Sequence, residues 1–408
     1  MTDIQRADGI ATYSNPLAAS RGEAYGETRS AILSEAGFDA AEREIAAWPG
    51  YAATALHALP AQARALDLGE LWYKDESTRF GLKSFKALGG AYAVFRLIQK
   101  AIGDKHHGHL AGPEEILSGK HRDIVSALTV TCATDGNHGR SVAWGAQLFG
   151  CRCVIYIHAT VSEGRREAIA RYGAEVIRVP GNYDDSVRHA AAEAERNGWT
   201  VVSDTTYEGY REIPIDVMHG YGVMSREIIG QLDADVPTHV IVQAGVGALA
   251  ASVCACFWLA WGDRRPVFII VEPEAADCFF QSGQAGHPVA VHGDLETVMA
   301  GLACGEVSPV AWDILAAGAD HFATVGDAFA LEGMRAFANP LAGDPAIVSG
   351  ETGASGLGLL LAARGNETLR RDLGLGPDAR VLLIGSEGDT DPAIYRDVVG
   401  RSAEEVAA

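Results

Sequence analysis

The sequence is poor in basic residues relative to acidic ones. It holds 33 lysines and arginines against 53 aspartates and glutamates, a formal net charge of −20. An acidic surface of this size repels nucleic acids and anionic lipids, because both carry dense negative charge. Neither is therefore an expected partner, and a local positive pocket for a phosphate group stays compatible with the composition.

Cysteine pairs and metal-binding patterns are also lacking. The seven cysteines form no Cys-x-x-Cys pair, and no Cys/His spacing typical of zinc is present. We therefore predict no metal site. Four of the cysteines lie in apolar stretches, where buried thiols are expected, and a pairing of Cys278 with Cys304 stays open.

No long apolar run or signal-like segment is visible. The first residues do not combine a charged segment with an apolar one. The longest apolar candidate, residues 246–261, is broken by glycines near both ends and is shorter than the ~20 residues that cross a bilayer. These absences predict a cytoplasmic protein that contacts no membrane.

Strand-like and helix-like segments alternate along the chain. This rhythm is typical of βαβ units in a parallel sheet, where ligands bind beyond the carboxyl ends of the strands. A chain of 408 residues has room for two or three domains of about 150 residues. We interpret 102–126 as a surface insertion. The predicted strands are 128–132, 153–157, 174–179, 200–202, 239–242, 267–271 and 380–384, and the predicted helices 139–148, 162–172 and 184–198.

Two polar motifs stand at or near predicted strand ends in the first half of the chain. Lys86 follows Phe85 on an apolar background, a setting that lowers the pKa of a lysine and makes it a Schiff-base former. Residues 134–139 form a Gly-containing turn before a helix, where Asn137 can donate a hydrogen bond and Asp135 can act as an acid or base. Alone, each motif also fits an ordinary surface lysine or a capping turn.

Two further motifs follow in the second half. Residues 243–249 contain Gly-x-Gly between a strand and a helix, the place for a phosphate group held by backbone N–H groups. The third glycine of the dinucleotide fingerprint and the Walker lysine are missing, which disfavours NAD and ATP. Ser386 follows the strand 380–384 and can bond a ring nitrogen; an ordinary polar turn is the other interpretation.

Four motifs follow one another along the chain: the lysine, the Gly-Asn-His loop, the Gly-rich loop and the late serine. With its motifs in this order, the sequence resembles the fold-type II pyridoxal-phosphate enzymes, the tryptophan synthase β and threonine dehydratase family. The resemblance implies an α/β chain of two domains, each a largely parallel open sheet flanked by helices. It implies pyridoxal 5′-phosphate as cofactor and a homodimer. We assign residues 1–90 and 218–408 to a large cofactor-binding domain and residues 91–217 to a small domain.

The same resemblance gives each motif a role. Lys86 is the Schiff-base lysine with Phe85 beside it, Asn137 contacts the phenolic oxygen of the cofactor, and Ser386 faces its pyridine nitrogen. The phosphate loop comprises Gly245, Val246, Gly247, Ala248 and Leu249.

Longer stretches are similar to the diaminopropionate ammonia-lyases. They are Arg-Phe-Gly-Leu-x-x-Phe-Lys at 79–86, Ala-Thr-Asp-Gly-Asn-His-Gly-Arg at 133–140, Asp-Thr-x-x-Glu-Gly-Tyr at 204–210 and Glu-Gly-Asp-Thr-Asp at 387–391. The resemblance implicates Asp135 and Asp204 in substrate handling and proton transfer. We place Thr134, Gly136 and His138 with them around the substrate, although a supporting role for His138 is the stronger interpretation. Lys83-Ser84 departs from the Asn-Ala of the family.

The resemblance predicts elimination of ammonia from 2,3-diaminopropionate, giving pyruvate and two molecules of ammonia. Lys86 or Asp135 removes the α-proton, and Asp135 and Asp204 offer negative charge to the β-ammonium of the substrate. Three alternatives stay open: a lyase or dehydratase for another 3-substituted amino acid such as serine or threonine, a catalytically silent binding protein, and Asp204 as a helix cap. Glu351 is expected to be structural or gating.

Overall fold

The structure is a computed structural model that describes residues 5–7, 9–134 and 136–408. The chain divides into two compact units, which are described separately here. Unit 1 comprises residues 1–35, 53–78 and 224–408, and unit 2 comprises residues 36–52 and 79–223. Residues 36–52, 79–90 and 218–223 therefore lie with unit 2, whereas the sequence analysis assigned them to the larger domain.

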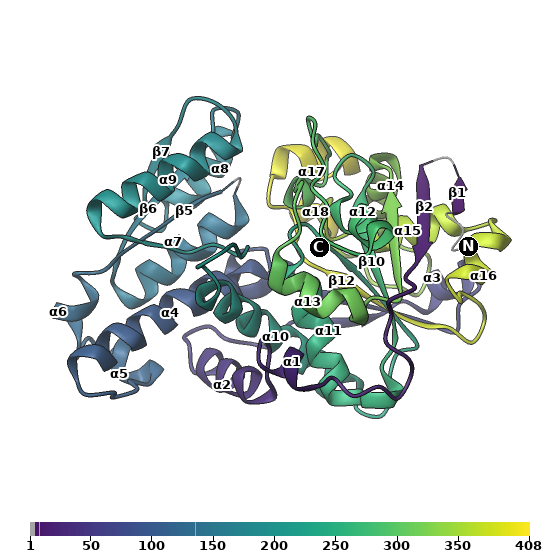
Figure 1. Cartoon of the computed structure of the whole chain (residues 1–408). Helices are drawn as coiled ribbons and strands as arrows, with labels where there is room; N and C mark the ends of the chain where they lie inside the picture. The colour runs from purple at the N-terminus through teal and green to yellow at the C-terminus, as the bar shows by residue number, and fades with distance from the viewer. Residues whose placement is uncertain (1–4, 8, 135) are drawn as a thin grey trace. The chain divides into compact units, whose positions relative to one another are not determined.

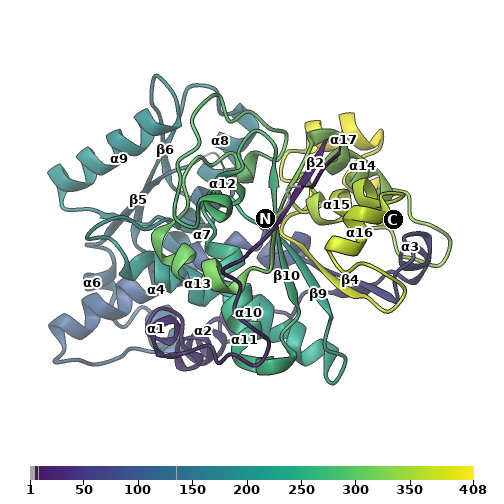
Figure 2. The same cartoon turned by 45° about the vertical axis from the view of Figure 1, so that its right-hand side comes forward.

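Unit 1 is built on one mixed sheet. Its five central strands are parallel, and antiparallel strands pair at both edges. Figure 2 shows the two strands β9 and β10 running side by side in this sheet. Within the described residues the order of the eight strands is β1 (Gln5–Ala7), β2 (Ile10–Ser14), β11 (His321–Val325), β10 (Val267–Pro273), β9 (His239–Gln243), β12 (Arg380–Gly385), β4 (Glu70–Asp75) and β3 (Leu56–Ala58).

Most residues of the central strands of unit 1 are apolar and buried, because helices cover the sheet. Every residue of β9 is buried, as expected for a parallel strand with no solvent-facing side. The helices that lie wholly in unit 1 are α1 (Glu27–Ser30), α3 (Pro60–Ala65), α11 (Ala248–Trp261), α12 (Cys278–Ala285), α13 (Pro309–Gly318), α14 (Asp327–Ala338), α15 (Ser355–Ala363), α16 (Glu367–Asp372), α17 (Pro392–Val399) and α18 (Ala403–Ala407).

Unit 2 holds a smaller sheet whose strand pairs are all parallel. Within the described residues its order is β7 (Glu175–Arg178), β6 (Arg152–Ile157), β5 (Thr129–Ala133) and β8 (Thr200–Val201). Helices α7 (Asn137–Phe149) and α9 (Tyr183–Asn197) contact β5 and β6 and lie on opposite sides of the sheet (Figure 1). The other helices here are α4 (Lys86–Lys105), α5 (Pro113–Leu117), α6 (Arg122–Val125), α8 (Glu163–Ala170) and most of α2 (Glu35–Ala46); α10 (Glu212–Leu232) spans the division.

The predicted fold class is confirmed, and the predicted strands and helices agree with the structure to within about two residues at most ends. The insertion 102–126 differs from a plain surface loop. It contains α5 and α6, and it buries Ala111, Ile116, Ile124 and Val125. Among the described residues, no helix is long and apolar enough to pass through a lipid bilayer.

Candidate active site

Lys86 is the first residue of α4, and its backbone is held from two sides. The Ser84 Oγ accepts a hydrogen bond from the Lys86 N–H at 3.3 Å, and the Ser141 Oγ on α7 donates to the Lys86 carbonyl at 2.6 Å. Phe85 is buried with its ring centroid 4.6 Å from that of Tyr221. The Lys86 Nζ lies 5.5 Å from the Phe85 ring centre. The backbone of Lys86 is therefore fixed by hydrogen bonds, and its side chain begins next to a buried aromatic pair.

The Lys86 ammonium forms an ion pair with the carboxylate of Asp204, far away in the sequence. The two side chains are 20% and 18% exposed, so the pair is poorly screened by water. Burial raises the pKa of Asp204, but the positive charge of the Lys86 ammonium and the hydrogen bond that it donates oppose this effect, and the net pKa lies below the usual range. Asp204 therefore carries a negative charge at the lysine nitrogen.

A tyrosine closes the loop that carries Asp204. The Tyr210 hydroxyl donates to the Val201 carbonyl at 2.9 Å and accepts from the Ser203 N–H at 2.9 Å. The Tyr207 ring stacks on it with centroids 4.8 Å apart. These bonds explain the Asp-Thr-x-x-Glu-Gly-Tyr pattern, since its last residue fixes the backbone just before its first. Asp204 lies too far before α10, which begins at Glu212, to cap that helix.

The Gly-Asn-His loop enters α7 through a side-chain turn. The Thr134 Oγ1 accepts the N–H groups of Gly136 and Gly139, both at 3.0 Å, so its hydroxyl stabilises the loop itself. The Asn137 Oδ1 accepts a hydrogen bond from Arg140 at 2.9 Å, which leaves the amide nitrogen as the donor end. Asp135 lies outside the described residues.

His138 joins the loop to the strand that leads to Asp204. Its Nε2 lies 2.8 Å from the Val202 carbonyl and therefore carries the proton, while its Nδ1 lies 3.9 Å from the Asp204 Oδ2. Burial lowers the pKa of His138 most strongly, although Asp204 raises it. A neutral His138 thus supports the Asp204 segment.

In unit 1 the predicted phosphate loop connects β9 to α11. Gly247 has a φ of +98°, and a Cβ at this residue would lie 2.3 Å from the Phe279 ring. A Cβ on Gly245 would lie 3.0 Å from the Gly301 carbonyl. The Val246 carbonyl accepts the Ser308 N–H at 2.9 Å. Val246 to Leu249 thus enter a helix N-terminus, whose first N–H groups have no partner within the helix and suit a phosphate.

Ser386 stands directly after β12. It is 2% exposed, and its Oγ has no hydrogen-bond partner among the residues the structure describes. Gln243 at the end of β9 donates to the Ile384 carbonyl at 3.0 Å, which ties the two strand ends together. A glycine cradle and a buried, unpaired hydroxyl at one edge of the sheet fit the phosphate and the ring nitrogen of pyridoxal phosphate. Glu351 is also buried in unit 1.

Sequence reasoning missed Tyr221 on α10. Its side chain is fully buried, and burial raises its pKa, an effect that the Lys86 ammonium opposes and the Asp204 carboxylate reinforces. A Cβ on Gly89 would lie 2.3 Å from the Tyr221 ring, so α4 and α10 approach closely here. A tyrosine between two glycines was the only signal in the sequence.

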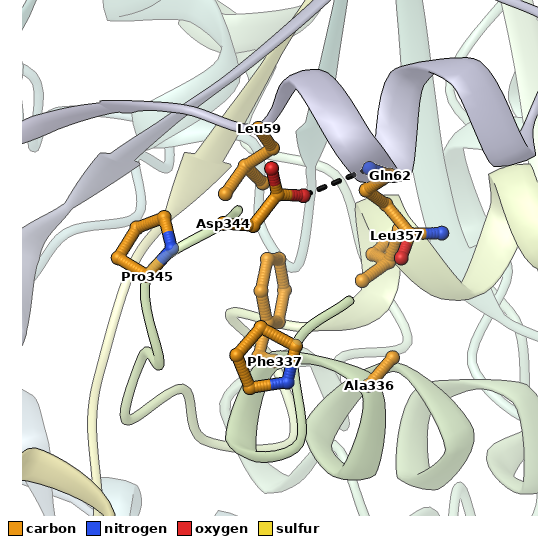
Figure 3. Close-up of a pocket in the computed structure, with 8 residues that line it drawn as sticks. Leu59, Gln62, Ala336, Phe337, Asp344, Pro345 and Leu357 are labelled. Atoms are coloured by element: carbon orange, nitrogen blue, oxygen red, sulfur yellow. Dashed lines mark hydrogen bonds between the residues drawn. The ribbon is translucent and has the colours of Figure 1, made fainter. Parts of the chain in front are cut away.

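A crevice in unit 1 is lined by none of the predicted site residues. Figure 3 shows the Asp344 carboxylate pointing to the backbone of Gln62. This carboxylate accepts the N–H groups of Ala61 and Gln62, both at 2.8 Å, and so caps α3. The crevice is therefore a helix-capping feature. Its lining residues are Leu59, Gln62, Ala336, Phe337, Pro340, Asp344, Pro345 and Leu357.

Residues 47–387 match the family described as pyridoxal-phosphate dependent enzyme, and the chain belongs to this family. The predicted fold type and cofactor, pyridoxal 5′-phosphate, are thereby confirmed. Within the family the chain is similar to diaminopropionate ammonia-lyase of Escherichia coli strain K12, with 44% identity over 365 residues that cover 88% of this chain and 90% of the relative.

Solved structures agree. The crystal structure of the Escherichia coli diaminopropionate ammonia-lyase in complex with D-serine matches with a TM-score of 0.85 and 39% identity, over 98% of this chain and 99% of that one. A second structure of that enzyme, in complex with an aminoacrylate-PLP azomethine reaction intermediate, matches with a TM-score of 0.84 and 39% identity, over 98% and 97% of the two chains.

Proposed function

We propose that this protein eliminates ammonia from 2,3-diaminopropionate and releases pyruvate and two molecules of ammonia. The ion pair between Lys86 and Asp204 carries the proposal. A fixed carboxylate beside the reacting lysine suits a substrate that bears a second ammonium group. The similarity to the Escherichia coli diaminopropionate ammonia-lyase supports the same activity.

Five groups of the chain would hold the cofactor. The Lys86 amine would be the attachment point, the Asn137 amide would donate to the phenolic oxygen, and the Ser386 hydroxyl would donate to the ring nitrogen. Backbone N–H groups of 245–249 bind the phosphate, and Phe85 supplies apolar contact beside Lys86. When bound, pyridoxal phosphate withdraws electrons from the α-carbon of the substrate amino acid and so makes its α-proton acidic.

In this proposal, side chains of the protein transfer the protons. The amine of Lys86 takes the α-proton from one face of the substrate, and the Asp204 carboxylate stabilises the ammonium that results. Asp135 is the second acid or base of the proposal and would serve the opposite enantiomer. Thr134, Gly136 and His138 support this loop, the first and last through the hydrogen bonds of their side chains.

Departure of the β-amino group explains the need for a carboxylate. The low pKa keeps Asp204 ionised, so it attracts the β-ammonium electrostatically and positions it as a leaving group. A serine or threonine dehydratase expels a hydroxyl and gains nothing from this charge. For this reason we favour a diamino substrate. We further propose that the protein is cytoplasmic and that it forms a homodimer, and the resemblance to the family implies the dimer.

The proposal is tested by measuring pyruvate release from the purified holoenzyme. The substrates are D- and L-2,3-diaminopropionate, with D- and L-serine and threonine assayed in parallel. We expect fast release from diaminopropionate and slow release from the hydroxy amino acids. Faster turnover of serine or threonine than of diaminopropionate would overturn the substrate assignment.

A further inference from the structure

A compact group of metal-ligating side chains lies in unit 2, in the insertion between α4 and β5. The His109 Nε2 lies 2.8 Å from one carboxylate oxygen of Glu115, and the His121 Nε2 lies 2.8 Å from the other. One ligand atom from each of the three residues can be chosen so that all lie within 4.8 Å of one another. These residues take no part in the proposed active site.

The segment that presents the three side chains is well anchored. The Gln99 side chain on α4 donates to the Ala111 carbonyl at 2.8 Å in a buried bond. Ile116, which follows Glu115 on α5, is 2% exposed, and His121 itself is 8% exposed. Gly108 has a φ of +85° and turns the chain so that its N–H reaches the Gly103 carbonyl at 2.8 Å. The ligand atoms are therefore brought together by folded backbone.

Two imidazole nitrogens and one carboxylate oxygen suit zinc, copper and nickel and do not suit calcium or magnesium, which prefer oxygen ligands. Zinc binds such atoms at ~2.0–2.2 Å. Neighbouring ligands of a tetrahedral zinc therefore lie ~3.3 Å apart, a little more than the present N–O separations, so small side-chain rotations make room for the ion.

We propose that His109, Glu115 and His121 form a binding site for a divalent transition-metal ion, with zinc as the representative ion. The His106 ring, with its centroid 5.3 Å from that of His121, borders the site. The ion would join the end of α4 to the α5–α6 segment. The sequence predicted no metal site because it holds no Cys-x-x-Cys pair and no Cys/His spacing typical of zinc, a criterion that does not cover His-x₅-Glu-x₅-His.

Lys120 competes with a metal ion for Glu115. Its Nζ lies 2.6 Å from the Glu115 carboxylate, so the positive charge of the lysine neutralises the negative charge that would attract the ion. The Lys120 side chain is 66% exposed and can swing into solvent without burying any charge. Removal of this lysine therefore separates the two possible purposes of the cluster. A metal site gains affinity when its competitor is removed, whereas a plain hydrogen-bond cluster loses a partner and binds no metal in either form.

The test is isothermal titration of the holoenzyme with zinc chloride, and with magnesium chloride for comparison. We expect one zinc per chain and no magnesium at the same concentrations. His109→Ala changes an exposed residue and Glu115→Gln keeps the side-chain shape; each should weaken zinc binding by about tenfold or more. His107→Asn is the matched control, because Asn tolerates the positive φ of 55° at this position, and it should bind zinc like the unaltered protein.

Lys120→Ala completes the series and should bind zinc several-fold more tightly than the unaltered protein. The proposal is overturned if the unaltered protein binds no zinc. It is equally overturned if His109→Ala and Glu115→Gln bind zinc as tightly as His107→Asn, since the ion would then occupy some other part of the chain.

Discussion

At the scale of single residues, the proposed chemistry depends on the charged nitrogen of Lys86 and the carboxylate of Asp204 next to it. Lys86 is 20% exposed on its side chain and begins a helix whose first turn is otherwise apolar. Replacing it with alanine removes the only group proposed to attach the cofactor. We expect Lys86→Ala to lose the visible absorption of the bound cofactor and its turnover. Lys100→Ala, an exposed lysine on the same helix, serves as control and should keep both.

Full turnover in Lys86→Ala would disprove the assignment of this lysine. Absorption spectra of the purified variants, recorded with and without added pyridoxal phosphate, give the cofactor content. Initial rates of pyruvate formation give the activity.

Asp204 is the second residue whose charge matters. Asp204→Asn keeps the size of the side chain but removes the negative charge beside Lys86. We expect the cofactor to remain bound and kcat for diaminopropionate to fall by ~10²–10⁴-fold, the usual range for loss of a group that assists proton transfer. An unchanged kcat in steady-state assays would show that this carboxylate only pairs with the lysine in the resting protein.

At the scale of elements, the loop after β8 positions Asp204 through the Tyr210 hydroxyl. Tyr210→Phe removes two hydrogen bonds, to the Val201 carbonyl and from the Ser203 N–H. Each is worth ~0.5–1.5 kcal/mol net, so the loop should loosen without unfolding the unit. We expect kcat to fall ~3–10-fold and the melting temperature to drop by a few degrees, while KM changes little.

Tyr207→Phe is the matched control for this prediction. Tyr207 stacks on Tyr210 but is 52% exposed. Removing the Tyr207 hydroxyl should therefore leave kcat unchanged. If both variants lose activity to the same extent, the loss does not come specifically from the two hydrogen bonds of Tyr210.

The turn into α11 is the second element that can be tested. Gly247→Ala places a methyl group against the Phe279 ring on a backbone with positive φ. Crowding of this kind costs ~1–3 kcal/mol and distorts the N–H groups proposed to bind phosphate. We expect the affinity for pyridoxal phosphate, measured by titration of the apoenzyme, to fall about tenfold or more.

Gly262→Ala provides the comparison at the other end of the same helix. Gly262 also has a positive φ, of 54°, but a Cβ there meets nothing within 4 Å. Similar cofactor affinities for Gly247→Ala and Gly262→Ala would mean that close packing at the phosphate loop is unimportant.

At the scale of the whole molecule, buried histidines make stability depend on pH. Burial is the main cause that lowers the pKa of His219 in unit 2 and of His239 in unit 1, each to about 4. In the unfolded chain a histidine titrates at ~6.5. Between these values the unfolded state binds protons that the folded state does not, so the free energy of unfolding falls as the pH drops from ~6.5 toward 4.

We expect the histidines to lower the free energy of unfolding at pH 5 relative to pH 7, while Asp216 and Glu272, whose pKa values burial raises to about 6 and about 8, act in the opposite direction. Urea titrations followed by circular dichroism at the two pH values measure the net difference. His239→Gln keeps a polar side chain at this position but cannot gain a proton, so the difference between the two pH values should shrink. An equally large difference in this variant would assign the pH dependence to other groups.

The sequence predicts those structural features that depend on residues close together in the chain. The strands 129–133 and 239–243 and the helix 137–149 were predictable because apolar runs, glycines and turn residues act on neighbouring backbone. Lys86, Asn137, Gly247 and Ser386 were recognisable for the same reason, since each stands in a short motif near a strand end or a helix start. The edge strands β1, β2 and β3 were missed because short antiparallel strands depend on a partner found only after folding.

The sequence by itself therefore determined the fold class, the family and the cofactor, and it predicted the residues that we propose to carry the chemistry. Only the tertiary structure decided which of these residues meet. It paired Lys86 with Asp204, brought Tyr221 to the same place and joined His109, Glu115 and His121 within the insertion. The contacts of Lys86 arise from packing between segments that are distant in the chain, whereas the contacts of Glu115 arise from the folding of one insertion; no periodicity or spacing in the sequence encodes either.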